Sequence, residues 1–314
     1  MESTEISKLF IENINKILTP QGYKHIISKD NNLFRFDVIN RLLIEIQCKD
    51  AFDVRTADEW EINNRKVKKK SKGINILIPM YSTQYIDVDT REPINIEEFT
   101  ADELMLALKL NIIEKIENID TMFVKEVFDI KQTNSYDNYK YIPYKPVIKS
   151  STLIEIVRDI TGCLIEKSDI TYYSKSDNKF MVNRQSYTQL SKYVVDVLVE
   201  YYMNNYITDS IISEYKYTEY DLDLIRLTIQ YSLDTLLITH RDADFDIVNH
   251  TSTDKLINIL TITDSIVFNV IEKIDYTGAS INKDITFSIN NLKKAEALLD
   301  IMEANNISKI MKGA

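Results

Sequence analysis

The chain has 314 residues and a net charge of -10, and it contains only five glycines, five prolines and three histidines. The glycines stand alone, so no segment forms a P-loop or a dinucleotide-binding loop, and the histidines are too few for a histidine-rich metal centre. Two distant cysteines, no signal segment and no long apolar run predict a cytoplasmic protein with no membrane contact.

The first half of the chain is predicted to mix helices and strands. Apolar residues at helical spacing predict a helix from the N-terminus to Pro20 and a second helix over 35–47. A T-A-D-E capping box at 56–59 begins a short helix that carries the only tryptophan, Trp60. The following elements are, in order, a basic turn at 65–73, a strand at 74–79, a helix from 100 to about 117, and a strand at 122–130.

The segment 135–150 is the clearest domain boundary, because it is polar, rich in tyrosine and contains two of the five prolines. We therefore expect a linker at 135–150 between domains at 1–134 and 151–314. Beyond the linker, the pattern predicts a helix that ends at Gly162, a hairpin that turns at 176–178, and long helices at about 186–206, 218–238, 252–275 and 290–312. The predicted fold class is α+β, with a mixed N-terminal domain and a mainly helical second domain that contains a small sheet.

The basic turn, RKVKKKSKG at 65–73, is the strongest local charge asymmetry. Its six cations are Arg65, Lys66, Lys68, Lys69, Lys70 and Lys72, and they leave a charge of -16 on the rest of a chain whose total is -10. Cations this close together repel one another, whereas a polyanion would bind them with release of its counterions. We predict that these six residues contact phosphates of single-stranded DNA and that Trp60 supports the turn or stacks on a base. A solvated loop, with Trp60 in the core, is the alternative.

The segment from Asn32 to Thr133 resembles the N-terminal domain of ArdC-like antirestriction proteins of plasmids, conjugative elements and phages. The matching words, in the family's order and spacing, are NRLLIEIQ at 40–47, Trp60, NRKVKKKSKGINILIP at 64–79 and VFDIKQT at 127–133. This resemblance implies a domain that binds single-stranded DNA. Asn64 and Lys70 replace two family glycines; asparagine tolerates the left-handed backbone conformation, and Lys70 adds a charge.

The second half resembles the family's zincin-type metallopeptidase domain in a degenerate form. In place of the motif H-E-x-x-H stand Val199, Glu200, Tyr201, Tyr202 and Met203, so only the glutamate is retained, and the third ligand would fall near Asp223. Val199 and Met203 cannot bind zinc, and without zinc Glu200 has no activated water on which to act as a base. The resemblance therefore implies a pseudo-metallopeptidase with no catalytic residue, no bound metal and no cofactor, in which Glu200 is solvated or hydrogen-bonded.

Together these features predict a non-catalytic protein of a mobile element that binds single-stranded DNA and protects or processes incoming DNA. The second domain would serve as a scaffold or as a surface for a host protein or an element-encoded protein. The alternative is a protein-binding inhibitor of a host defence or replication enzyme, acting through an acidic surface that mimics DNA. Carboxylates clustered on one face, with spacing like that of duplex phosphates, would favour that alternative, and scattered carboxylates would count against it. An active peptidase would require metal ligands that this sequence lacks.

Overall fold

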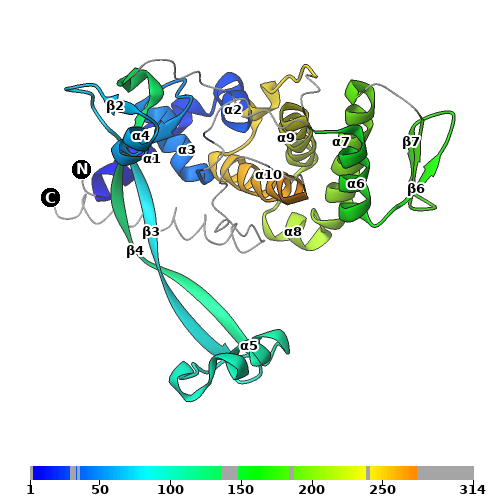
Figure 1. The fold of residues 1–314 in the computed structure, drawn as a ribbon, viewed down its shortest axis with the longest axis horizontal. Helices are drawn as coiled ribbons and strands as arrows, with labels where there is room; N and C mark the ends of the chain where they lie inside the picture. The colour runs from blue at the N-terminus through cyan, green and yellow to red at the C-terminus, as the bar shows by residue number, and fades with distance from the viewer. Residues whose placement is uncertain are drawn as a thin grey trace.

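The computed structural model has a mixed α+β architecture (Figure 1), which confirms the predicted fold class. It describes residues 3–28, 33, 36–135, 148–183, 187–237 and 241–273. The helix predicted at 290–312 and most of the predicted linker lie outside these residues. Each helix within the described ranges is too short or too polar to span a lipid bilayer.

Three helices open the fold: α1 (Ser3–Ile17), α2 (Pro20–Ile27) and α3 (Val38–Gln47). Pro20, predicted as the end of the first helix, also begins α2, and the Thr19 side chain accepts a hydrogen bond from the backbone N–H of Gly22. Proline suits the first helical position because the N–H that it lacks would have no helical partner there. Helix α2 is therefore an element that the sequence prediction did not include.

A long two-stranded ribbon, here called the arm, projects from the body of the molecule (Figure 1). Strand β3 (Ile74–Asp87) pairs antiparallel with β4 (Ile113–Asp129), with one irregularity between Met80 and Tyr81. The 3-10 helix η2 (Ile96–Glu98) and helix α5 (Ala101–Lys109) lie between the two strands in the chain, and Figure 1 shows α5 at the far end of the ribbon. The predicted helix to about residue 117 is wrong, because α5 ends at Lys109 and β4 has begun by Ile113.

Short elements form the base of the arm. These are β1 (Val54–Arg55), α4 (Ala57–Ile62), β2 (Arg65–Val67), η3 (Ile130–Gln132) and β5 (Thr133–Ser135). Strand β1 pairs with the inner end of β4, and β2 pairs antiparallel with β5. Both predicted T-A-D-E capping boxes are confirmed, at Thr56 with Glu59 and at Thr100 with Glu103.

The second half is mainly helical with one small sheet. Its elements are α6 (Ser150–Thr161), β6 (Leu164–Lys167), β7 (Tyr172–Ser174), β8 (Lys179–Val182), α7 (Tyr187–Asn205), α8 (Asp209–Glu214), α9 (Glu219–Leu237), η4 (Asp246–His250) and α10 (Thr253–Lys273). Gly162 ends α6 with a φ of 66°, and β7 pairs antiparallel with β8, so the predicted helix end and hairpin are both confirmed. Strand β6 joins the hairpin by parallel pairing with β8.

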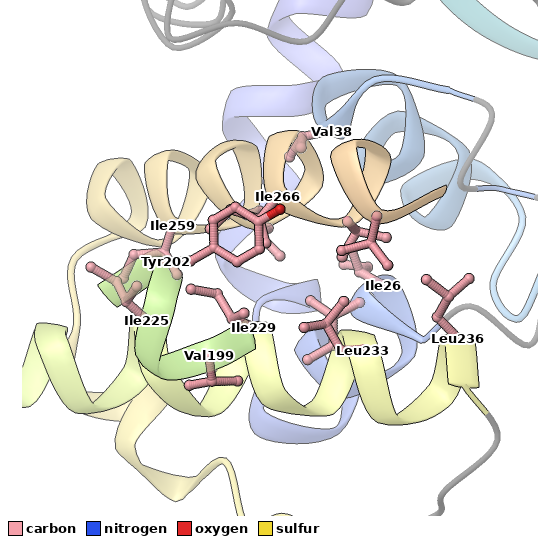
Figure 2. Packing of buried hydrophobic residues seen from close by; sticks show 14 of the residues in the cluster. Ile26, Val38, Val199, Tyr202, Ile225, Ile229, Leu233, Leu236, Ile259 and Ile266 are labelled. Carbon is pink, nitrogen blue, oxygen red and sulfur yellow. The ribbon is translucent and has the colours of Figure 1, made fainter. Parts of the chain in front are cut away.

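One buried apolar cluster includes residues from both halves of the chain. Figure 2 labels members of this cluster from both halves: Ile26 of α2 and Val38 of α3, and Leu233 of α9 and Ile266 of α10. Polar contacts join the halves inside this cluster as well. The hydroxyl oxygens of Tyr23 and Thr228 lie 3.1 Å apart, and the buried Arg41 guanidinium pairs with the Asp264 carboxylate. The N-terminal helices therefore pack into the same core as α9 and α10, and the domain division at 135–150 stays a prediction.

Candidate nucleic-acid interface

The basic turn is held against η3 by several hydrogen bonds. The backbone N–H of Lys68 donates to the Gln132 carbonyl at 2.8 Å, and the Gln132 side-chain amide donates to the Lys72 carbonyl at 2.7 Å. The Ser71 hydroxyl donates to the same Gln132 carbonyl at 3.3 Å. Gln132 in turn caps η3 together with the buried Asp129. Bonds at both ends of the turn fix its backbone before any ligand binds.

Five lysines of the basic turn have exposed side chains: Lys66, Lys68, Lys69, Lys70 and Lys72. The Lys68 ammonium donates to the Lys131 carbonyl at 2.7 Å, which places its charge next to η3. The predicted turn at 65–73 therefore begins as strand β2, and the structure presents five of the six predicted cations to solvent, Lys66 on β2 and the other four on the turn that follows it. Their contact with DNA stays a prediction.

Arg65 is the sixth predicted cation, and its side chain is buried, with 8% of its surface exposed. Its Nε donates to the Thr133 hydroxyl at 2.6 Å, and its guanidinium lies 5.8 Å from the centre of the Trp60 ring. The prediction that Arg65 contacts phosphate is therefore corrected. Arg65 instead joins β2 to β5 at the start of the basic turn.

Trp60 is fully buried, with 0% of its surface exposed. Its indole Nε1 donates to the Phe128 carbonyl at 2.8 Å, and the Arg55 guanidinium lies 5.1 Å from the ring centre. No face of the ring is open to a base, so the predicted stacking role is wrong in this structure. The supporting role agrees with the geometry, because Trp60 ties α4 to the end of β4.

The two positions where the sequence replaces a family glycine both have left-handed backbone. Asn64 has a φ of 57° and Lys70 a φ of 69°. Asparagine adopts this conformation readily, whereas lysine does so at a cost in free energy. Asn64 thus adopts the conformation that the sequence analysis expected asparagine to tolerate, and Lys70 adopts it as well.

The predicted degenerate metal site lies on α7 and α9. Val199 is buried in the main apolar cluster (Figure 2), and Met203 packs against the same cluster. The Glu200 carboxylate pairs with the Arg226 guanidinium of α9, and Asp223 is exposed. The helix face that would carry the two zinc-binding histidines is therefore filled by apolar packing, and the retained glutamate has a cationic partner.

A second group of potential metal ligands lies elsewhere and was not predicted. His25, Glu45 and Asp50 place one ligand atom each within 4.8 Å of the others. Burial raises the pKa of the Glu45 carboxyl, and the neighbouring His25 opposes that rise. The three residues come from α2, from α3 and from the turn after α3, so no sequence spacing connects them.

The outer part of the arm, residues 87–120, also went unpredicted as a site. It contains ten acidic and three basic residues. Helix α5 and the segment that follows it expose large apolar side chains: Met105 (68%), Leu106 (56%), Leu110 (59%) and Ile112 (53%). The available signal was the composition of this segment, but apolar residues on a predicted helix are normally assigned to a core.

No family model matches the chain, and no curated protein matches it. Solved structures similar to it include the antirestriction ArdC protein from the R388 plasmid in two forms. The match to the metal-free structure covers 75% of this chain and 84% of that chain, with 14% identity and a TM-score of 0.42. The match to the Mn(II)-bound structure covers 76% and 84%, with 10% identity and a TM-score of 0.38.

Proposed function

We propose that this protein binds single-stranded DNA through the exposed lysines of the basic turn. The observation that carries the proposal is the exposure of five lysines on β2 and the hydrogen-bonded turn that follows it: Lys66, Lys68, Lys69, Lys70 and Lys72. A pre-ordered cationic turn binds phosphate with little loss of conformational entropy, and each neutralised phosphate releases counterions. Because Trp60 is buried, we expect backbone recognition with little preference among bases.

We further propose that the protein is not a peptidase. Val199 and Met203 offer no lone pair suited to zinc at the two positions of the resembling motif, and both pack against the apolar cluster. The Glu200 carboxylate pairs with Arg226, so a general-base role would require that pair to open. In this proposal the helices of the second half serve as a scaffold. We base the proposed biological role, which is to protect or process incoming DNA of a mobile element, on the resemblance in sequence.

Charge reversal tests the DNA-binding proposal. The variant Lys68→Glu/Lys69→Glu/Lys70→Glu removes three candidate phosphate contacts, and Lys16→Glu/Lys109→Glu/Lys167→Glu makes the same change in net charge at exposed positions elsewhere. Fluorescence anisotropy with a labelled single strand measures affinity over a range of salt concentrations. We expect the turn variant to lose most of its affinity. The plot of log K against log[salt] should also become less steep, its slope decreasing in magnitude by about 2, at about 0.7 for each lost contact.

The control variant separates a local site from a general charge effect. We expect its affinity to stay within about threefold of the original protein at 0.15 M salt, because exposed charges farther than about 8 Å are screened. Equal losses in the two variants would contradict a binding site at the basic turn.

The outer arm supports a second candidate function, which is binding to a protein partner. Residues 87–120, at the projecting end of the arm, carry ten acidic and three basic residues, and this local excess of carboxylates supports the inhibitor alternative. The exposed apolar residues of α5 add a feature that a pure DNA mimic would not need. We propose a partner with an apolar pocket rimmed by lysine and arginine, because such a surface complements both the charge and the apolar side chains of the arm.

Site-specific photo-crosslinking tests the arm. A photoreactive residue at position 106, on α5, should capture a partner, whereas the same residue at position 62 should not, although Ile62 is 80% exposed. The captured protein, once purified, should bind the original chain and lose that binding with Leu106→Asp. Binding that survives Leu106→Asp would exclude α5 as the contact surface.

A further inference from the structure

The fold brings three side chains with metal-binding chemistry to one place at the edge of the N-terminal helices. His25 lies near the end of α2, Glu45 lies on α3, and Asp50 lies in the turn that follows α3. One ligand atom of each lies within 4.8 Å of the other two. An imidazole nitrogen with two carboxylates is a donor set that first-row divalent metals accept.

The Glu45 carboxylate is the distinctive member of this group. Its side chain is 5% exposed, and its Oε2 makes no hydrogen bond with any residue that the structure describes. The same oxygen lies 3.5 Å from His25 Nε2, which also lacks a hydrogen-bond partner among those residues. A buried carboxylate oxygen and a buried imidazole nitrogen, each without a hydrogen bond, are costly to leave unsatisfied. At 3.5 Å the two atoms form an ion pair when His25 is protonated, but no hydrogen bond joins them.

We propose that His25, Glu45 and Asp50 bind one divalent transition-metal ion. The His25 to Glu45 separation of 3.5 Å fits two ligands of one ion, because metal-to-ligand distances of about 2.1 Å place neighbouring ligand atoms about 3.0–3.5 Å apart. Asp50 is exposed and can adjust its side chain to complete the set. Water fills the remaining positions of the ion on the exposed side of His25 and Asp50.

The proposed site lies next to contacts that lead to the basic turn. The Asp50 carbonyl accepts a hydrogen bond from the Lys131 ammonium at 2.6 Å, and the Lys131 carbonyl accepts one from the Lys68 ammonium at 2.7 Å. A bound ion would therefore fix the turn after α3 from which this chain of contacts starts. The metal site does not depend on DNA binding, and its test uses no DNA.

Metal titration of the full chain tests the proposal. Protein freed of metal with a chelator is titrated with Zn²⁺ and with Mn²⁺ by calorimetry, and with Co²⁺ by visible absorption, which reports the geometry around the ion. We expect one ion per chain, a raised melting temperature, and Co²⁺ bands that the chelator abolishes. Glu45→Gln, which keeps the shape of the side chain, should weaken binding more than about 10-fold.

Three further variants separate loss of the metal site from general damage to the protein. Asp50→Asn lies at an exposed position that does not endanger folding, and we expect it to weaken binding as well. Asp242→Asn and His250→Gln change exposed residues of the same types elsewhere and should leave the stoichiometry and affinity unchanged. No saturable binding at millimolar metal, or full binding in both Glu45→Gln and Asp50→Asn, would overturn the proposal.

Discussion

Lys70 combines two unfavourable features at one residue of the basic turn. Its φ of 69° is a left-handed conformation that costs a residue with a side chain about 1–2 kcal/mol. Its exposed charge also lies among those of Lys68, Lys69 and Lys72. A glycine would remove both costs, so the stability of the fold does not explain the lysine. Ligand binding does explain it if the added charge contacts phosphate.

Lys70→Gly is therefore expected to stabilise the protein while weakening its affinity for single-stranded DNA. Lys69→Gly is the matched control, because it removes the same charge at a neighbouring position with no left-handed backbone. Urea denaturation should show Lys70→Gly to be more stable than Lys69→Gly by about 1 kcal/mol. Anisotropy titrations should show similar losses of affinity in both. Equal stability of the two variants would mean that Lys70 is not strained in solution.

Trp60 provides a direct optical test of its supporting role, because it is the only tryptophan in the chain. A fully buried indole should emit at short wavelength and resist quenching by iodide. Saturating single-stranded DNA should leave this emission nearly unchanged, since the ring has no open face. A base stacked on Trp60 would instead quench its fluorescence strongly on binding. Saturable DNA binding in the anisotropy titration, together with constant Trp60 emission, would match the structure.

The sequence reveals the charge of the basic turn but not the direction of each side chain. Alternation along β2 turns Arg65 inward and Lys66 outward, and this depends on the pairing of β2 with β5, which is far away in sequence. The resemblance gave a hint of left-handed backbone at Asn64, which replaces a glycine of the resembling motif, but the sequence analysis drew no such inference for Lys70. The approach of His25 to Glu45 could not be predicted, because it depends on how α2 packs against α3.

At the scale of elements, the arm shows where sequence patterns mislead. Ile113, Ile116 and Ile119 recur every three residues, which is a helical spacing, yet all three lie in β4. Pairing with β3 along the whole ribbon overrides the local pattern, since it satisfies the backbone groups of both strands. Elements with a local signal, such as the capping boxes and the αL end at Gly162, were predicted correctly.

Helices α9 and α10 are joined by an ion pair whose contribution depends on pH. The Lys255 ammonium on α10 donates to the buried Asp221 carboxylate at 2.6 Å, and that carboxylate also accepts from the Thr218 backbone at 2.7 Å. Burial alone would raise the pKa of Asp221, but the hydrogen bonds from Lys255 and Thr218 lower it overall. We expect Asp221→Asn to cost about 1–3 kcal/mol of unfolding free energy at neutral pH.

The pH dependence follows from the lowered pKa of Asp221. An acid whose pKa is lower in the folded state stabilises the fold above its unfolded pKa of about 3.9 and loses that effect as pH falls through the folded value. The difference in stability between the original chain and Asp221→Asn should therefore shrink below about pH 4. Asp223→Asn, on the same helix but exposed, is the control and should change stability by less than about 0.5 kcal/mol at either pH.

At the scale of the whole molecule, the shared core predicts how the protein unfolds. The main apolar cluster includes Phe10 of α1 and Leu42 of α3 together with Leu233 of α9 and Leu260 of α10. A break between the halves would expose these side chains and would leave the buried Arg41 guanidinium without its Asp264 partner. The two halves should therefore unfold together, although the composition of 135–150 is typical of a linker.

Two probes test this cooperativity in one denaturant titration. Trp60 fluorescence reports on the base of the arm in the first half. Far-UV circular dichroism is dominated by helices, and α7, α9 and α10, the longest among the described residues, lie in the second half. We expect the two probes to report coincident transitions. In Arg41→Ala both midpoints should shift together, because removal of one partner of a buried ion pair destabilises the fold by about 3–5 kcal/mol. A fragment of residues 1–134 should lack a cooperative transition, since its core would lose α9 and α10. Separate midpoints for the two probes, with a folded 1–134 fragment, would instead establish two independent domains.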